Sequence, residues 1–129
     1  MLLLDTHALI WLATDLTQLP DPAKAAIRCH ASELHVSAIT TLEISLLTQC
    51  GKLDWGKRPL SRYERALKHH GVKVIPVDSE IAWKSGQLPP VHRDPFDRVI
   101  IATAQTHEMT ILTKDRTIPT YPKIKVVWE

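Results

Sequence analysis

Five short apolar segments alternate along this chain with stretches of helical periodicity, and this alternation is the feature that most restricts the fold. Strands that are buried on both faces of a parallel sheet read as short apolar runs, and helices connect them. We therefore expect an α/β fold with a mostly parallel central sheet flanked by helices. The expected strands cover residues 1–4, 34–39, 72–77, 109–113 and 123–128.

Helix start and stop signals lie between these segments. Asp21, Asp78 and Asp94 are predicted N-caps, and a proline directly follows Asp21 and Asp94. Gly51 and Gly71 are expected to end helices, because glycine readily adopts the left-handed conformation found there. The expected helices cover residues 6–13, 21–32, 40–51, 60–71, 78–88 and 95–107.

The length and composition suit one globular unit, so we expect a single domain over residues 1–129. The net charge of +2 neither indicates nor excludes a nucleic-acid ligand, because a local patch can be basic on a nearly neutral protein. The first residues lack a signal-peptide pattern, and no apolar run approaches the ~20 residues of a membrane span. Cys29 and Cys50 have no metal or disulfide spacing, which favours reduced thiols in a cytoplasmic protein.

Acidic residues fall where the ends of the expected strands and the starts of the helices meet. Asp5 ends the first strand, and Asp115 follows the fourth. Glu43 lies in the first turn of the helix that leaves the second strand, and Asp97 lies in the first turn of the last helix. Sites in open α/β sheets form beyond the carboxyl ends of the strands. We therefore expect these carboxylates, with Asp94 nearby, to share one edge of the sheet.

The expected meeting of these acids indicates a divalent metal ion. Crowded carboxylates repel one another unless a cation compensates their charge. Oxygen ligands suit Mg²⁺ or Mn²⁺, and no histidine or cysteine set has zinc spacing. Each acid also has a purely structural interpretation: Glu43 can close a capping box with Thr40, Asp94 can cap a helix, and Asp115 can belong to a turn. These interpretations explain single residues, but they do not explain why four acids should meet.

Four segments together resemble the PIN-domain ribonucleases, and within them the toxin component of VapBC toxin–antitoxin pairs. The segments are "LLLDTHALIWL", "VSAITTLEISLLTQCGKL", "HRDPFDRVIIATA" and "ILTKDRTIPTYPKIKVVW", and the resemblance runs over essentially the whole chain. It implies a single PIN domain with a Rossmann-like three-layer fold. It also implies a Mg²⁺- or Mn²⁺-dependent endoribonuclease that leaves 5′-phosphates, is inhibited by a cognate antitoxin, and is usually a homodimer.

The resemblance assigns roles to individual positions of this chain. The positions that match the family's catalytic and metal-binding acidic quartet are Asp5, Glu43, Asp97 and Asp115. The positions that match an additional acid and two accompanying hydroxyls, expected to lie behind the ligands and orient them, are Asp94, Thr6 and Thr113. The chain departs from many relatives at Thr103, where they have glutamine, and this departure has no expected effect on metal binding.

Basic residues near the acids and in the middle of the chain are candidates for binding RNA such as tRNA or rRNA. Arg93 and Arg98 flank the acids and can hold phosphates, although Arg98 can equally pair with Asp94 at i, i+4 spacing. Trp55 is either a stacking platform for a base or the cover of a core edge, and His92 is a minor candidate. The middle region offers a basic groove, with a solvated helix face as the alternative, at Lys52, Lys57, Arg58, Arg62, Arg65 and Lys68.

Two phosphotransfer families that also place acids after strands fit less well. A haloacid-dehalogenase-type enzyme needs a second aspartate two positions after Asp5, where this chain has His7. A response-regulator receiver needs an early acidic pair and a central acceptor aspartate, which the chain does not offer. A catalytically idle PIN binding module and a housekeeping RNA-processing nuclease without an antitoxin stay open. Apolar candidates for dimer or antitoxin contacts, with core burial as the alternative, are Trp11, Leu12, Leu46 and Leu47.

Overall fold

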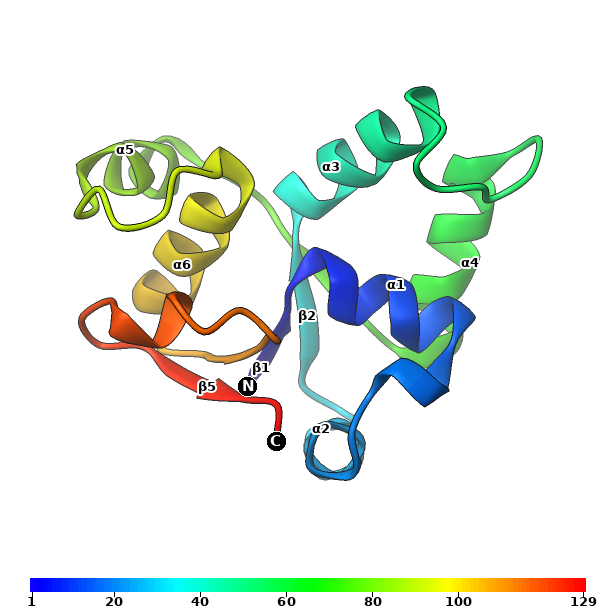
Figure 1. Ribbon diagram of the computed structural model, residues 1–129, viewed down its shortest axis with the longest axis horizontal. Helices are drawn as coiled ribbons and strands as arrows, with labels where there is room; N and C mark the ends of the chain where they lie inside the picture. Colours follow the sequence, from blue (N-terminus) through cyan, green and yellow to red (C-terminus); the bar gives the residue numbers. More distant parts are fainter.

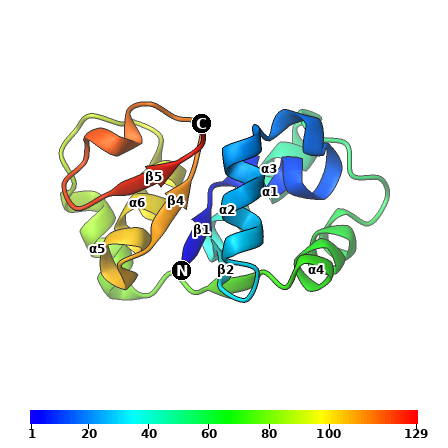
Figure 2. The same cartoon turned by 90° about the horizontal axis from the view of Figure 1, so that it is seen from below.

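Five strands form one sheet in the computed structural model, which describes residues 1–129 (Figures 1 and 2). The strand order is β3-β2-β1-β4-β5, and all four pairings are parallel. The strands are β1 (Leu2–Leu4), β2 (Leu34–Ser37), β3 (Lys73–Ile75), β4 (Thr110–Leu112) and β5 (Lys125–Val127). The expected α/β fold with a mostly parallel sheet is confirmed.

Six α-helices and two short 3₁₀ helices connect the strands. The α-helices are α1 (Thr6–Thr14), α2 (Asp21–Cys29), α3 (Ala38–Gln49), α4 (Pro59–His70), α5 (Ser79–Gln87) and α6 (Pro95–His107). The 3₁₀ helices are η1 (Leu16–Gln18) and η2 (Ile118–Thr120). Asp78 and Asp94 cap α5 and α6 as expected, by accepting from the backbone N–H groups of Ile81 and Phe96. None of these helices is long and apolar enough to cross a membrane.

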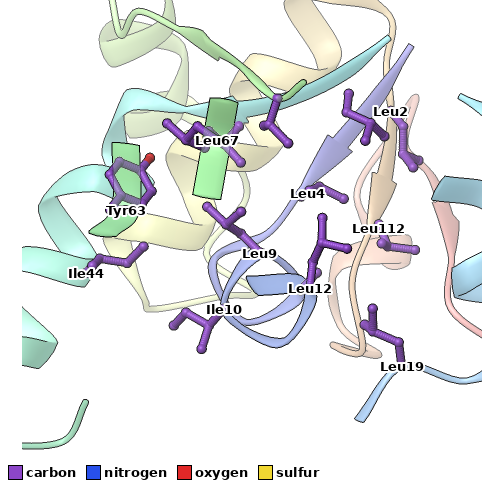
Figure 3. Packing of buried hydrophobic residues seen from close by; sticks show 14 of the residues in the cluster. Leu2, Leu4, Leu9, Ile10, Leu12, Leu19, Ile44, Tyr63, Leu67 and Leu112 are labelled. Carbon is purple, nitrogen blue, oxygen red and sulfur yellow. The ribbon is translucent and has the colours of Figure 1, made fainter. Parts of the chain in front are cut away.

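The central strand β1 contributes to a hydrophobic core on each face of the sheet. Leu2 and Leu4 point into one core, which also holds buried residues of α1, α3 and α4 (Figure 3). Leu3 points the opposite way, into a core formed with Ile100 and Ile101 of α6. All three leucines are fully buried. Burial on both faces explains why the strand is an unbroken apolar run rather than an alternating one.

The start of α3 differs from the expected boundary and changes the interpretation of Glu43. The expected strand over 34–39 ends at Ser37, whose hydroxyl caps α3 by accepting from the N–H of Ile39 at 3.1 Å. Thr40 is therefore inside the helix, and the capping box of Thr40 and Glu43 is wrong. Glu43 lies in the second turn of α3 rather than the first, so helix capping no longer accounts for it.

The two other local interpretations that the structure corrects concern Asp21 and Trp55. Pro20 occupies the N-cap position of α2, and Asp21 is the first helical residue without a side-chain capping bond. Trp55 is only 3% exposed and stacks on Tyr63 with ring centroids 6.3 Å apart, so it covers the core and is no platform for a base. Among the apolar interface candidates, Leu12 is buried, whereas Leu46 is 48% exposed.

Candidate metal centre

The carboxyl edge of the sheet brings the acidic residues together. Asp5 directly follows β1, and Asp115 lies three residues beyond β4, which pairs with β1 through Leu4 and Leu112. Asp97 lies in the first turn of α6. Glu43 reaches the same edge from α3, which leaves the carboxyl end of β2. The neighbouring positions of β1, β2 and β4 in the sheet thus explain why these distant residues converge.

Asp5 is buried at the centre of this edge, with an exposed fraction of 8%. Its carboxylate caps α1 by accepting from the N–H of Ala8 at 2.8 Å. Burial raises the pKa of Asp5, and the charge of Glu43 raises it further, although a hydrogen bond from Thr113 and the N–H of Ala8 act in the opposite direction. Asp5 therefore combines a structural role at the helix start with an unfavourable buried charge.

Asp97 shows most clearly that the acids share one site. Burial raises the pKa of Asp97 to about 7, and the charges of Asp94, Asp5 and Glu43 contribute to the shift, while His92 opposes it. Carboxylates raise one another's pKa in this way only when they lie close together. The expected meeting of these acids at one edge is present in the structure, and their mutual repulsion leaves a strongly negative environment for a cation.

Glu43 supplies the most direct sign that the site suits a cation. Its Oε1 atom is buried and has no hydrogen-bond partner. A buried carboxylate oxygen without a donor or a cation is costly, because the charge has left water and gained nothing in exchange. An oxygen that faces other carboxylates fits a hard divalent cation such as Mg²⁺ or Mn²⁺. The donor set therefore matches the metal that the sequence predicts.

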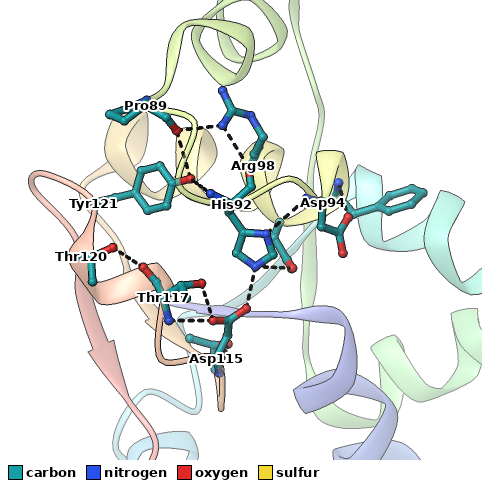
Figure 4. Close-up of polar contacts among 11 residues, drawn as sticks. Pro89, His92, Asp94, Arg98, Asp115, Thr117, Thr120 and Tyr121 are labelled. Atoms are coloured by element: carbon teal, nitrogen blue, oxygen red, sulfur yellow. Dashed lines mark hydrogen bonds and ion pairs between the residues drawn. The ribbon is translucent and has the colours of Figure 1, made fainter.

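His92 joins Asp115 to the other acids (Figure 4). Its Nε2 atom lies 2.6 Å from Oδ2 of Asp115 and 3.1 Å from Oδ2 of Asp97. One ligand atom from each of these three residues falls within a 4.8 Å span. Burial acts to raise the pKa of Asp115, but hydrogen bonds from Thr117 and His92 outweigh it and lower that pKa. His92 thus has a larger part in the site than that of the minor candidate expected from the sequence, and its place at the head of the "HRDPFDR" segment is the signal for it.

Two hydroxyl residues stand behind the acids. Thr113 accepts from the N–H of Asp115 at 3.0 Å and is also bonded to the carboxylate of Asp5, so it joins the two strand-end acids. Thr6 follows Asp5, and its hydroxyl lies 3.1 Å from the hydroxyl of Thr40 in the contact between α1 and α3. Both side chains are buried next to the site, where the resemblance places supporting hydroxyls.

Comparison with known proteins identifies the family of this chain. The PIN-domain family, described as "PIN domain", matches residues 2–124 of this chain. The chain belongs to the PIN-domain family. The curated protein "Ribonuclease VapC22" of Mycobacterium tuberculosis is 32% identical to this PIN domain over 129 residues, which cover 98% of the chain and 97% of that relative.

Solved structures share the fold of this PIN domain. One is a VapBC2 complex from Rickettsia felis bound to a DNA fragment from its promoter. A chain of that complex matches with a TM-score of 0.75 at 15% identity, and the match covers 99% of this chain and 98% of that chain. A toxin–antitoxin complex from Klebsiella pneumoniae has a TM-score of 0.63 at 22% identity, with 96% and 95% coverage. At these identities the similarity concerns the fold alone.

Arg98 has a different role in this PIN domain from the one expected. Its guanidinium donates to the backbone carbonyls of Ser85, Leu88, Pro89 and His92 at 2.7 to 3.2 Å. The alternative ion pair with Asp94 is not among the ion pairs of the structure. The bonds to the carbonyls give Arg98 a structural role, and its expected phosphate contact stays a prediction.

The other basic candidates are exposed and make no ion pair. Arg93 directly precedes Asp94 in the chain. Lys52 follows α3, and Arg62 and Arg65 lie on α4, where Arg62 also sits 5.8 Å from the ring of Trp55. The structure thus leaves these four side chains available to a ligand, with Arg93 nearest in the chain to the acids.

Proposed function

We propose that this PIN domain is a metal-dependent endoribonuclease and the toxin of a toxin–antitoxin pair. The observation that carries the proposal is the unpartnered, buried oxygen of Glu43 among the carboxylates of Asp5, Asp94 and Asp97. A cation would offset the cost of burying this carboxylate oxygen, because most buried polar atoms in folded proteins have a partner. The name of the VapC22 relative, a ribonuclease, favours RNA as the substrate.

The proposed ligands of the divalent ion are Asp5, Glu43, Asp97 and Asp115. A bound Mg²⁺ or Mn²⁺ supplies Lewis-acid chemistry, which lowers the pKa of water and neutralises charge that develops on a phosphodiester. Thr113 holds the backbone of Asp115 and the carboxylate of Asp5 in place. Thr6 and Asp94 act from behind the ligands, through the contact with Thr40 and through the cap of α6.

RNA contact is assigned to the exposed cations that make no ion pair. Arg93, next to Asp94 in the chain, would hold a phosphate near the acids, since a guanidinium binds phosphate oxygens through two parallel hydrogen bonds. Lys52, Arg62 and Arg65 extend the contact along α3 and α4, where cations track a backbone without reading its sequence. Their proposed contribution is affinity for structured RNA such as tRNA or rRNA.

We further propose that this protein binds a cognate antitoxin, forms a homodimer, and acts in the cytoplasm. The solved structures that share this fold are VapBC and toxin–antitoxin complexes. Between α3 and α4 this chain has a cavity of about 270 Å³ whose lining includes Ile44, Leu60 and Tyr63. Leu60, which lines this cavity, exposes 60% of its area, and Leu46 of α3 exposes 48%. Apolar groups exposed together mark protein-binding surfaces.

The test is cleavage of total tRNA and rRNA by the purified, partner-free protein in Mg²⁺, Mn²⁺ or EDTA. We expect discrete, metal-dependent cuts with 5′-phosphate ends from the wild type and none from Asp97→Asn. Asp21→Asn is the matched control, because Asp21 is an exposed acid on α2 without a capping bond. Absence of both cleavage and metal binding would favour the idle binding module. Cleavage without growth arrest on expression would favour the housekeeping nuclease.

A further inference from the structure

Arg98, near the start of α6, holds the end of α5 and the loop that connects the two helices. Nε donates to the carbonyl of Ser85 at 3.2 Å, and Nη2 donates to that of Leu88 at 2.7 Å. Nη1 donates to Pro89 at 2.9 Å and to His92 at 3.1 Å. A planar guanidinium with several bonds to one backbone segment restricts that segment strongly. The backbone of His92 is thereby fixed relative to α6, which also carries Asp97.

Tyr121 holds the same loop from the opposite side (Figure 4). Its hydroxyl accepts from the N–H of His92 at 2.6 Å and donates to the carbonyl of Pro89 at 3.2 Å. Tyr121 is 3% exposed and packs in the core with Ile118. It follows η2, a few residues beyond Asp115 in the chain. The loop is therefore tied to both segments whose acids His92 touches.

The hydrogen bonds of the imidazole determine which ring nitrogen carries the proton. Nδ1 of His92 accepts from the backbone N–H of Asp94 at 3.2 Å. A nitrogen that accepts must present its lone pair, so in the neutral ring the proton is on Nε2. The Nε2–H group is then the donor to Oδ2 of Asp115 at 2.6 Å and to Oδ2 of Asp97 at 3.1 Å.

This tautomer conflicts with direct coordination of a metal by His92. Imidazole binds a metal through a nitrogen lone pair. To present one at Nε2, the ring would carry its proton on Nδ1, where it would face the N–H of Asp94, and two donors would oppose each other. The short span of the His92, Asp97 and Asp115 atoms is better explained by hydrogen bonds than by a shared ion.

We propose that His92 is a positioning residue whose Nε2–H orients Asp97 and Asp115, and that Arg98 and Tyr121 hold it in place. The inference rests on the proposed metal site, because its consequence is a preformed pair of ligands. Hydrogen-bonded partners behind metal ligands typically contribute about 10- to 100-fold in affinity. Three residues of the "HRDPFDR" segment then act together. His92 orients two ligands, the N–H of Asp94 sets the tautomer of His92, and Arg98 fixes the loop.

The first experiment reads the tautomer in the metal-free wild type by ¹⁵N NMR of histidine side chains. The spectrum is recorded at about pH 8, above the usual range of histidine titration. His92→Gln identifies the resonances of His92 by their loss. We expect the signature of an Nε2–H tautomer. An Nδ1–H tautomer would overturn the inference, whatever the protein does with metal or RNA.

The second experiment measures Mn²⁺ affinity by calorimetry for wild type, His92→Phe and His92→Gln, with His107→Gln as a control at an exposed histidine. We expect about 10- to 100-fold weaker binding for His92→Phe. His92→Gln keeps a side-chain N–H donor and should recover most of the affinity. Tyr121→Phe retains the ring and its packing but loses both hydroxyl bonds, and it should weaken Mn²⁺ binding without unfolding the protein.

The outcomes separate this inference from the proposed function. A wild type that binds no Mn²⁺ would overturn the metal site, and with it the role of His92 toward a metal. Normal Mn²⁺ binding that is unchanged in His92→Phe would overturn the positioning role alone. Pulsed EPR of the Mn²⁺ complex gives a third readout, since a ¹⁴N coupling that disappears in His92→Gln would make His92 a direct ligand and contradict the inference.

Discussion

The hydroxyl oxygens of Thr6 and Thr40 lie 3.1 Å apart in the buried contact between α1 and α3. Asp5 stands immediately before α1, and Glu43 lies one turn beyond Thr40 in α3. The hydrogen bond between the threonines therefore joins α1 and α3, the two helices beside which the proposed metal ligands Asp5 and Glu43 stand. Removing one hydroxyl leaves the other buried without a partner, which has consequences for both stability and metal binding.

We expect Thr40→Val to lower the free energy of unfolding by about 1–3 kcal/mol, the usual cost of an unsatisfied buried group. Valine keeps the shape of threonine, so the loss reports the hydrogen bond rather than a cavity. The double variant Thr6→Val with Thr40→Val should lose less than the sum of the single variants, because no orphaned hydroxyl is left. Urea denaturation of wild type, the two single variants and the double variant measures the four free energies of unfolding of this double-mutant cycle. Strictly additive losses would show that the two hydroxyls do not interact.

The raised pKa of Asp97 predicts a pH-dependent stability of the metal-free protein. Burial and the charge of Asp94 raise this pKa to about 7 from an ordinary 3.8. Between these values the folded state retains a proton that the unfolded state has released, so stability falls as the pH rises from about 4 to about 7. In EDTA, we expect Asp97→Asn to be more stable than wild type at about pH 8 by roughly 1 kcal/mol or more.

Thermal unfolding in EDTA across this pH range measures the effect of Asp97→Asn. The difference between variant and wild type should shrink as the pH falls to about 4 and below, where Asp97 becomes protonated in the unfolded state as well. Asp21→Asn, at an exposed position, should run parallel to wild type at all pH values. A stability difference between wild type and Asp97→Asn that does not depend on pH would show that the charge of Asp97 is not the cause.

A divalent metal should make wild type more stable than Asp97→Asn, the reverse of the order expected in EDTA. Wild-type protein is expected to gain about 2.7 kcal/mol when Mg²⁺ or Mn²⁺ is present at 100 times its Kd, whereas Asp97→Asn should gain little. Glu43→Gln should also respond weakly, because the amide cannot supply the negative charge of the unpartnered oxygen. Differential scanning fluorimetry against metal concentration records both shifts. A wild type indifferent to both metals would leave only the idle binding module.

Arg98 and Arg93 should behave differently although they flank the same acids. Arg98→Ala should lower the free energy of unfolding by about 2–4 kcal/mol, because four backbone carbonyls lose their donor. Arg93→Ala, at an exposed residue without an ion pair, should change stability by less than about 0.5 kcal/mol. It should instead weaken RNA binding and reduce the salt dependence of the affinity by about one charge. Denaturation and filter binding at several salt concentrations distinguish the two roles.

Much of the fold and of the acidic set was predictable from local signals. The strand of Leu2–Leu4, the caps at Asp78 and Asp94, and the end of α4 at Gly71 all follow from residue types within a few positions. Local signals predicted the wrong cap for the helix that carries Glu43, because Ser37 and Thr40 are both residue types that cap helices. The choice between them depends on where β2 stops pairing with its neighbours.

The sequence by itself determined that Asp5 and Asp115 would reach one edge of a parallel sheet, since strands joined by helices run in the same direction and end on the same side. Only the tertiary structure decided that Glu43 has an unpartnered oxygen, that His92 joins Asp97 to Asp115, and that Arg98 binds the carbonyls of a loop. These properties arise from contacts between distant segments, such as the 23 residues that separate His92 from Asp115. Helical and strand periodicity describe which face of an element is buried, and they carry no information about which polar groups meet across elements.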